Sequence, residues 1–143
     1  MATELLVTGL VGGLTATVVM TVVMMVVGDG GPPPTARLVA KFADGEPEEY
    51  KMPGMLLHFV YGIGAGGALA VGAPLVGVGF DEVAVALVVG LAYGVLLMVV
   101  GMVFWMRLVM DVEPDKKTMM TFAVAHVVYG VVLGAVLWTG ILA

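Results

Sequence analysis

The stretch His58-Phe59-Val60-Tyr61-Gly62-Ile63-Gly64-Ala65-Gly66 returns 68 residues later as His126-Val127-Val128-Tyr129-Gly130-Val131-Val132-Leu133-Gly134. Both copies read HxxYGxxxG, and together they hold the only two histidines of the chain and two of its four tyrosines. On a helix, the His, the Tyr three residues on and the two glycines share one face. The repeat thus joins small residues that favour close helix packing to polar residues that are costly in an apolar segment.

The composition around this repeat is that of a membrane protein. The 143 residues are 61% hydrophobic and only 12% charged, with a mean hydropathy of +1.11, whereas soluble domains are about a quarter charged. Four long apolar runs exceed the roughly 20 residues that a helix needs to cross a bilayer. The first run has no basic flank and is too long for a signal peptide. We predict an all-α polytopic membrane protein, one transmembrane domain over 1–143, with helices at about 5–27, 53–79, 83–110 and 118–142.

The connections between these runs are short and polar. Gly and Pro residues over 28–34 end the first helix, and we predict that Thr35 caps a short amphipathic helix over 35–43 at the membrane interface. All six Lys and Arg residues fall in two connections on the same side, at Arg37, Lys41, Lys51, Arg107, Lys116 and Lys117. The excess of positive charge on cytoplasmic loops therefore predicts a multi-pass protein of the cell membrane with both termini outside.

The offset of 68 residues extends beyond the motif. Met52 matches Met120, Leu69 matches Leu137, and the first and third helices share a fainter echo in Gly9–Gly13 and Gly90–Gly94. We interpret the chain as two parallel helical-hairpin repeats related by an axis along the membrane normal. In this interpretation the second and third helices form a tight hairpin, and the second and fourth helices meet at their glycines. The predicted packing glycines are Gly9, Gly13, Gly62, Gly66, Gly90, Gly94, Gly130 and Gly134.

The residue inventory excludes several kinds of chemistry. The chain has no Cys, Ser, Asn or Gln, and no carboxylate or lysine in the middle of an apolar run. Serine and cysteine nucleophiles are therefore excluded, and a carboxylate proton relay is not expected. We predict that the protein is not an enzyme and has no catalytic residues. The net charge of −5 argues against nucleic acid partners and is an archaeal-like acidic composition that suits a high-salt cytoplasm.

The paired motif is the predicted functional centre, made of His58, Tyr61, His126 and Tyr129. It fits a permeation unit, in which an oligomer supplies the pore, or an accessory subunit of a larger membrane complex. An alternative is that these residues only fix the register of the helices, because buried polar groups need partners whether or not they do chemistry. The expected partners are the lipid bilayer and further copies of the chain or other membrane subunits.

Two cofactor hypotheses remain open beside this interpretation. His58 and His126, at matched depth on parallel helices, have the pattern of a bis-histidine haem b site. Alternatively, thioethers are soft ligands that suit Cu(I), and methionines gather on two of the predicted helices. Met98, Met102, Met106 and Met110 repeat every fourth residue on the third helix, and Met20, Met24 and Met25 lie on the first. Methionine also fills gaps between glycine-rich helices without any metal, so this pattern has a purely structural explanation as well.

The run Gly9-Leu-Val-Gly-Gly-Leu-Thr-Ala-Thr-Val-Val-Met20, the proline-led segment after it and the two HxxYGxxxG motifs together resemble small four-helix membrane proteins related to the YagU-like inner-membrane proteins. The likeness covers most of the chain. It implies a four-helix fold and a membrane location, and it supplies no catalytic residues.

Overall fold

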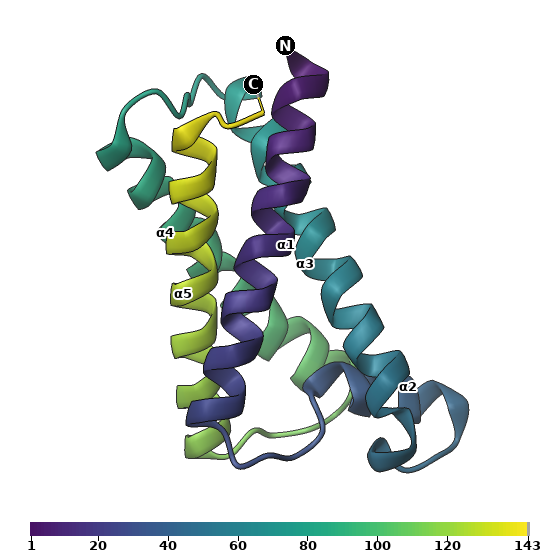
Figure 1. Ribbon diagram of the computed structural model, residues 1–143. Coiled ribbons are helices and arrows are strands. Elements are labelled where there is room, and N and C mark those ends of the chain that lie inside the picture. The colour runs from purple at the N-terminus through teal and green to yellow at the C-terminus, as the bar shows by residue number, and fades with distance from the viewer. Residues whose placement is uncertain (143) are drawn as a thin grey trace.

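A computed structural model describes residues 1–142, and over this range the protein is helical and has no strand. The long helices are α1 (Ala2–Val27), α3 (Lys51–Leu75), α4 (Val83–Val99) and α5 (Lys116–Thr139), and a π-helical segment, η2 (Val100–Val109), continues α4. A short helix α2 (Pro34–Ala43) and the 3-10 turn η1 (Pro47–Tyr50) connect α1 to α3 (Figure 1). Four of these spans are long and apolar enough to cross a membrane, which confirms the predicted all-α membrane fold.

The helix ends differ from the predicted ones where local capping decides them. The second long helix stops at Leu75 rather than at residue 79, because Gly77 turns the chain with a positive φ and the N–H of Val78 bonds the carbonyl of Ala73. The short helix begins at Pro34 with Pro33 as its N-cap, so the prediction that Thr35 is the cap is wrong. Proline suits the first helical position, since no helical partner awaits its missing N–H.

The last helix also has caps that place it two residues earlier at its start and three earlier at its end than predicted. Asp115 accepts a hydrogen bond from the backbone N–H of Thr118 at 2.8 Å and so fixes the start at Lys116. At the other end, Gly140 adopts a left-handed conformation with φ of 56°. Residues 140–142 therefore lie beyond the helix.

The prediction of one regular helix over 83–110 misses the π-helical segment η2. Its wide turns are seen in the bond from the N–H of Met110 to the carbonyl of Trp105, five residues back. Gly101 lies where a Cβ would come 2.5 Å from Cζ of Phe122, so the absent side chain leaves room for that ring.

The long helices form an open arc in the order α3, α1, α5, α4. α1 packs against both α3 and α5, and α4 packs against α5, whereas α3 has no comparable contact with α4 or α5 over the described residues. The expected tight hairpin between the second and third long helices is therefore wrong, and so is the expected meeting of the second and fourth at their glycines.

The predicted packing glycines lie instead at two interfaces, α1 with α3 and α4 with α5. A Cβ on Gly13 would lie 2.6 Å from the carbonyl oxygen of Gly62, and a Cβ on Gly130 would lie 2.9 Å from the carbonyl carbon of Gly90. These helices approach at backbone distance, where any side chain would force them apart. The other predicted glycines in the same contacts are Gly9, Gly66, Gly94 and Gly134.

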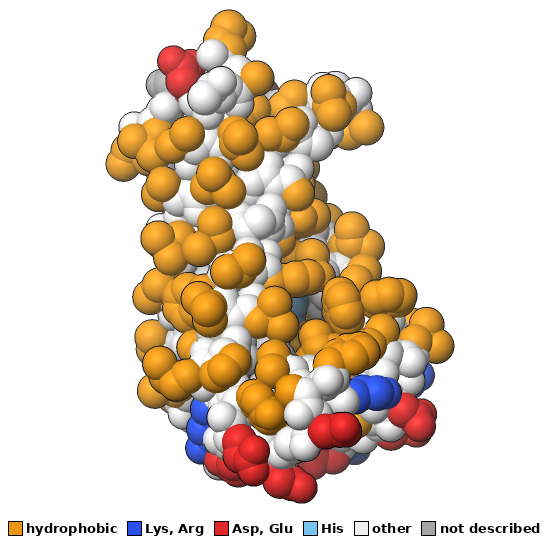
Figure 2. Space-filling view, turned by 90° about the vertical axis from the view of Figure 1, so that its right-hand side faces the viewer, with side chains coloured by type: hydrophobic (Ala, Val, Ile, Leu, Met, Phe, Trp, Pro, Cys, Tyr) orange, Lys and Arg blue, Asp and Glu red, His pale blue; other side chains and the backbone are white. Residues whose placement is uncertain are grey.

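The surface separates apolar from charged side chains along the helix axes. Figure 2 shows hydrophobic side chains over most of the height of the molecule and a band of acidic and basic side chains at one end. The short helix α2 lies at that end, where a Cβ on Gly54 of α3 would come 2.5 Å from the backbone of Ala36. This close contact fixes α2 across the mouth of the arc.

Candidate functional site

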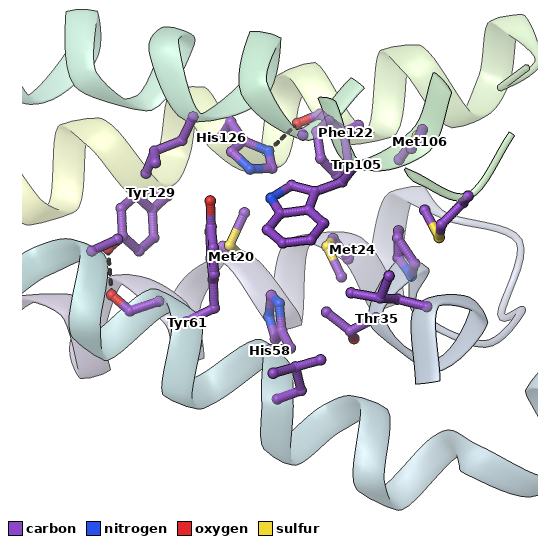
Figure 3. Close-up of a pocket in the computed structure, with 18 residues that line it drawn as sticks. Met20, Met24, Thr35, His58, Tyr61, Trp105, Met106, Phe122, His126 and Tyr129 are labelled. Atoms are coloured by element: carbon purple, nitrogen blue, oxygen red, sulfur yellow. Dashed lines mark hydrogen bonds between the residues drawn. The ribbon is translucent and has the colours of Figure 1, made fainter. Parts of the chain in front are cut away.

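The inner side of the arc encloses a chamber of about 150 Å³ (Figure 3). Every helix of the arc contributes to it, and α2 lines it near the charged end. His58 and Tyr61 of the first motif and His126 and Tyr129 of the second all line it. The four residues of the predicted functional centre therefore share one space. Other residues that line it include Met20, Met24, Thr35, Trp105, Met106, Met110 and Phe122.

The hydrogen bond of His58 determines which ring nitrogen carries the proton. Nε2 lies 3.1 Å from Oγ1 of Thr21, and the single proton of that hydroxyl is donated to the carbonyl of Thr17 at 2.6 Å. Thr21 Oγ1 must therefore accept from His58, so Nε2 carries the proton. In the neutral ring, Nδ1 is then a hydrogen-bond acceptor.

His126 is held in the opposite tautomer. Its Nδ1 lies 2.8 Å from the carbonyl oxygen of Phe122, one turn earlier on α5. A carbonyl oxygen only accepts, so Nδ1 carries the proton and the neutral ring keeps its lone pair on Nε2. Both motif histidines thus have their proton committed to the protein and retain one acceptor nitrogen.

Two tyrosines tie α3 to the other side of the arc at the end of the chamber away from α2. The hydroxyl of Tyr129 on α5 donates to the carbonyl of Gly62 at 2.5 Å, and the hydroxyl of Tyr93 on α4 donates to the carbonyl of Ala65 at 2.8 Å. Tyr129 is only 2% exposed. These bonds replace the missing helix contact between α3 and its opposite neighbours.

The chamber opens sideways between α3 and η2. Tyr61 and Trp105 meet there edge to face, with ring centroids 6.4 Å apart, and Tyr61 is 42% exposed. Figure 2 shows a histidine side chain at the bottom of a hollow in the apolar face on this side. The chamber is therefore reached from the apolar side of the molecule.

A second cleft of about 490 Å³ lies at the charged end and joins the chamber. It is lined by the connection 28–34, by Arg37 and by the polar turn before α5, and it shares Met24, Pro34, Met106, Met110 and Phe122 with the chamber. At this end of the molecule, the ammonium of Lys41 on α2 also donates to the carbonyl of Val109 at the end of η2. α2 is thus tied to both sides of the arc.

Sequence reasoning missed Trp105 as a chamber residue, whereas Met20 and Met24 were named there only as candidate copper ligands. Trp105 lies across the chamber between the two motif histidines in Figure 3, and Met20 and Met24 of α1 point into it. Thr35, predicted as a helix cap, has a buried Oγ1, the one buried side-chain oxygen or nitrogen among residues 1–142 without a hydrogen-bond partner. Its place after three prolines favoured a capping role, and nothing in the sequence indicated the chamber.

The two cofactor hypotheses fare differently in this geometry. An apolar cavity of about 150 Å³ holds a benzene-sized molecule, so the chamber does not fit a haem without large rearrangement. Of the methionines named for copper, Met98, Met102 and Met25 do not line the chamber, whereas four others do: Met20, Met24, Met106 and Met110. Over residues 1–142 there is no group of three or more His, Cys, Asp or Glu residues that could hold a metal.

Comparison with known proteins adds no relative, since no family model, curated protein or solved structure matches this chain. The resemblance to the YagU-like proteins therefore stays a prediction, and function has to be argued from the site alone.

Proposed function

We propose that the protein is a non-enzymatic membrane protein that holds a small, largely apolar molecule in the chamber between its two helix pairs, acting as a binding or accessory subunit. The observation that carries this proposal is a chamber that joins both motif copies and ends at the tyrosine bonds to Gly62 and Ala65. A closed end of this kind suits retention of a molecule better than passage.

The lining supports binding without catalysis. Each histidine donates its ring N–H to a neighbouring residue, His58 to Thr21 and His126 to Phe122. No carboxylate lines the chamber. A nucleophile next to a base with its own orienting group is the usual arrangement of an acyl-transfer or hydrolytic site, and the lining offers none.

The internal duplication, also part of this proposal, supplies a way to open the chamber. The glycine contacts hold α1 with α3 and α4 with α5, as two matched helix pairs. The pairs meet through α1 and α5, with Leu133 and Val136 beside Gly12, and on the opposite side through the two tyrosine bonds. Breaking those bonds would let the pairs rock about α1 and α5, as repeat-built membrane proteins do.

The apolar outer faces support the remaining parts of the proposal. Residues such as Val88, Leu96 and Leu108 are strongly exposed and need lipid or another membrane helix to cover them. Residence in the cell membrane with both termini outside follows from the lysines and arginines at one end. Association with further copies or with another membrane subunit would use the same faces.

Binding is tested by the fluorescence of Trp105, which lies in the chamber. The chain has only two tryptophans, and Trp138 is on the outer surface at 46% exposure, so a Trp138→Phe variant leaves Trp105 as the only tryptophan. Benzene added to this variant in detergent should change the Trp105 emission saturably. A Trp105→Phe variant, in which Trp138 is the only tryptophan, should show no saturable change in emission. A linear response in both variants would contradict a binding chamber.

Permeation is a second candidate, favoured by the cleft that joins the chamber to the charged end. In this case the tyrosine bonds are the closed gate, and a proton or small neutral solute would cross when they break. Proteoliposomes containing Tyr129→Phe should then leak protons or urea faster than the wild type. Equal leakage of both would leave binding as the function.

A further inference from the structure

We propose that the molecule held in the chamber is a neutral six-membered aromatic ring that carries a hydroxyl group, such as a phenol or the head of a quinol. This inference rests on the proposed binding function and names the ligand for it. Three features carry it, which are the tautomers of the two histidines, the unpaired hydroxyl of Thr35 and the size and neutrality of the chamber.

The tautomers of the two histidines leave acceptor nitrogens, so the ligand must supply a hydrogen-bond donor. His126 keeps its lone pair on Nε2 because Nδ1–H is bonded to the carbonyl of Phe122, and His58 keeps its lone pair on Nδ1 because Nε2–H is bonded to Thr21. A neutral imidazole with one nitrogen committed in this way accepts from a ligand and does not donate to it. A ligand with only acceptors, such as a ketone or an ether, leaves these nitrogens unpaired.

The chamber also contains hydrogen-bond donors without an acceptor. The oxygen of the same ligand hydroxyl can accept from them. Thr35 Oγ1 is buried and has no partner within the described residues, although its proton needs one. The indole N–H of Trp105 is a pure donor, and it takes no part in the hydrogen bonds that tie the chamber walls. A hydroxyl group donates once and accepts twice, so one such group has the capacity to pair with an imidazole nitrogen and with either donor.

Size and charge restrict the rest of the molecule. About 150 Å³ takes one benzene ring, and the edge-to-face pair of Tyr61 and Trp105 offers an aromatic wall. No Asp, Glu, Lys or Arg lines the chamber, so a carboxylate or an ammonium ion would be buried without a counter-charge. The neutral ring with its hydroxyl protonated is therefore the form that fits.

The same ring chemistry has two sources, a free phenol or the head group of a lipid-borne quinol. The sideways opening at Tyr61 faces the bilayer, so it provides an exit for an apolar tail. The two sources share the ring and the hydroxyl, and they differ only in whether a tail adds affinity.

The experiment compares phenol with anisole, its methyl ether, on the Trp138→Phe protein in detergent, with Trp105 emission as the readout. Excitation at the red edge of tryptophan absorption avoids the absorption of the probes. Phenol should bind about tenfold to a hundredfold more tightly than anisole, because the ether leaves the buried acceptor of His126 unpaired. In the His126→Phe variant, the preference for phenol over anisole should be lost, because only the apolar ring then contributes to binding. Thr35→Val, which removes a hydroxyl without breaking a bond, should lower phenol affinity while the protein stays folded.

The outcomes separate this inference from the proposed function. Equal affinity for phenol, anisole and benzene would overturn the hydroxyl requirement and keep a binding chamber. Saturable binding of none of the three would overturn both. A reduced hydroquinone with a decyl chain, tested in lipid nanodiscs, then identifies the source. Tighter binding than phenol indicates a quinol head, weaker binding indicates a free phenol, and both results support the hydroxylated ring.

Discussion

Replacing Tyr129 with phenylalanine removes one buried hydroxyl and tests the bond that holds the open side of the arc together. The bond to the carbonyl of Gly62 is 2.5 Å long, and the ring is 2% exposed, so neither water nor lipid can replace the hydroxyl. Gly62 lies within α3, where its carbonyl also accepts the helical bond, so the variant leaves one lone pair unpaired rather than a whole group. Hydrogen bonds between membrane helices average about 0.6 kcal/mol and reach about 1.7. We expect Tyr129→Phe to lower the free energy of unfolding by about 0.5 to 1.5 kcal/mol.

Two further hydroxyl removals act as controls of known sign. Thr35→Val deletes a hydroxyl that has no partner, so it should leave the free energy of unfolding unchanged or raise it by up to about 1 kcal/mol. Tyr50→Phe deletes the hydroxyl of a tyrosine outside the chamber, whose bond to the carbonyl of Ala43 is long and exposed, and should change stability by less than about 0.5 kcal/mol. The three variants remove the same atom from three environments.

The measurement is reversible unfolding in mixed micelles of a mild detergent and dodecyl sulfate, followed by circular dichroism. The predicted order of stability is Thr35→Val at or above the wild type, Tyr50→Phe close to it and Tyr129→Phe below both. A Tyr129→Phe protein as stable as Tyr50→Phe would refute the view that this bond ties α3 to α5. A Thr35→Val protein less stable than Tyr129→Phe would refute the view that the Thr35 hydroxyl is unpaired.

Three further predictions test the packing, a cap and the sideways opening. Gly130→Ala should lower the free energy of unfolding by about 1 to 3 kcal/mol because its Cβ meets the backbone of α4, while Gly64→Ala, with open space around it, should be neutral or slightly stabilising. Hydrogen bonds from Thr118 lower the pKa of Asp115 from its ordinary 3.8, and its side chain has a larger effect than its backbone. The stability that this cap adds is complete above about pH 4 and is lost as the pH falls through the lower folded value, so Asp115→Asn should flatten the acid side of the stability curve. In the Trp138→Phe protein, lipids brominated along their chains should quench Trp105 strongly if the chamber opens to the bilayer, and unaffected emission would contradict that opening.

The number and type of the long helices could be predicted from sequence because bilayer thickness imposes one length on every span. The helix ends could be predicted only to within a few residues. Pro33 and Pro34 both favour the start of a helix, and the capping role that we gave to Thr35 was equally consistent with the local pattern. Gly77 and Gly79 are likewise equally good candidates for the turn that ends the helix. Only the hydrogen bond from the N–H of Val78 to the carbonyl of Ala73 selects Gly77.

The sequence pattern predicted that the two motifs lie close together, but it predicted neither a chamber between them nor the way in which they meet. A GxxxG face shows that some helix packs closely there, and it does not name the partner. We paired the glycines of the second and fourth helices, whereas Gly62 contacts α1 and Gly130 contacts α4. The tyrosines span the gap that this arrangement leaves, so the bond from Tyr129 to Gly62 crosses between the motif copies after all.

The π-helical segment explains why the far wall of the chamber could not be found from a regular helical pattern. Gly101 and Met110 are nine residues apart and both line the chamber. In an α-helix of 3.6 residues per turn, nine residues make two and a half turns and place the two on opposite faces. With the wider turns of a π-helix, roughly 4.4 residues each, nine residues make close to two turns and return to the same face. The methionine stripe predicted on a regular helix, Met98 to Met110, is divided by the change of helix type, so Met106 and Met110 line the chamber and Met98 and Met102 do not. Met106, five residues after Gly101, comes back to the chamber side with these wider turns, so the far wall of the chamber and the irregular helix arise from one structural feature.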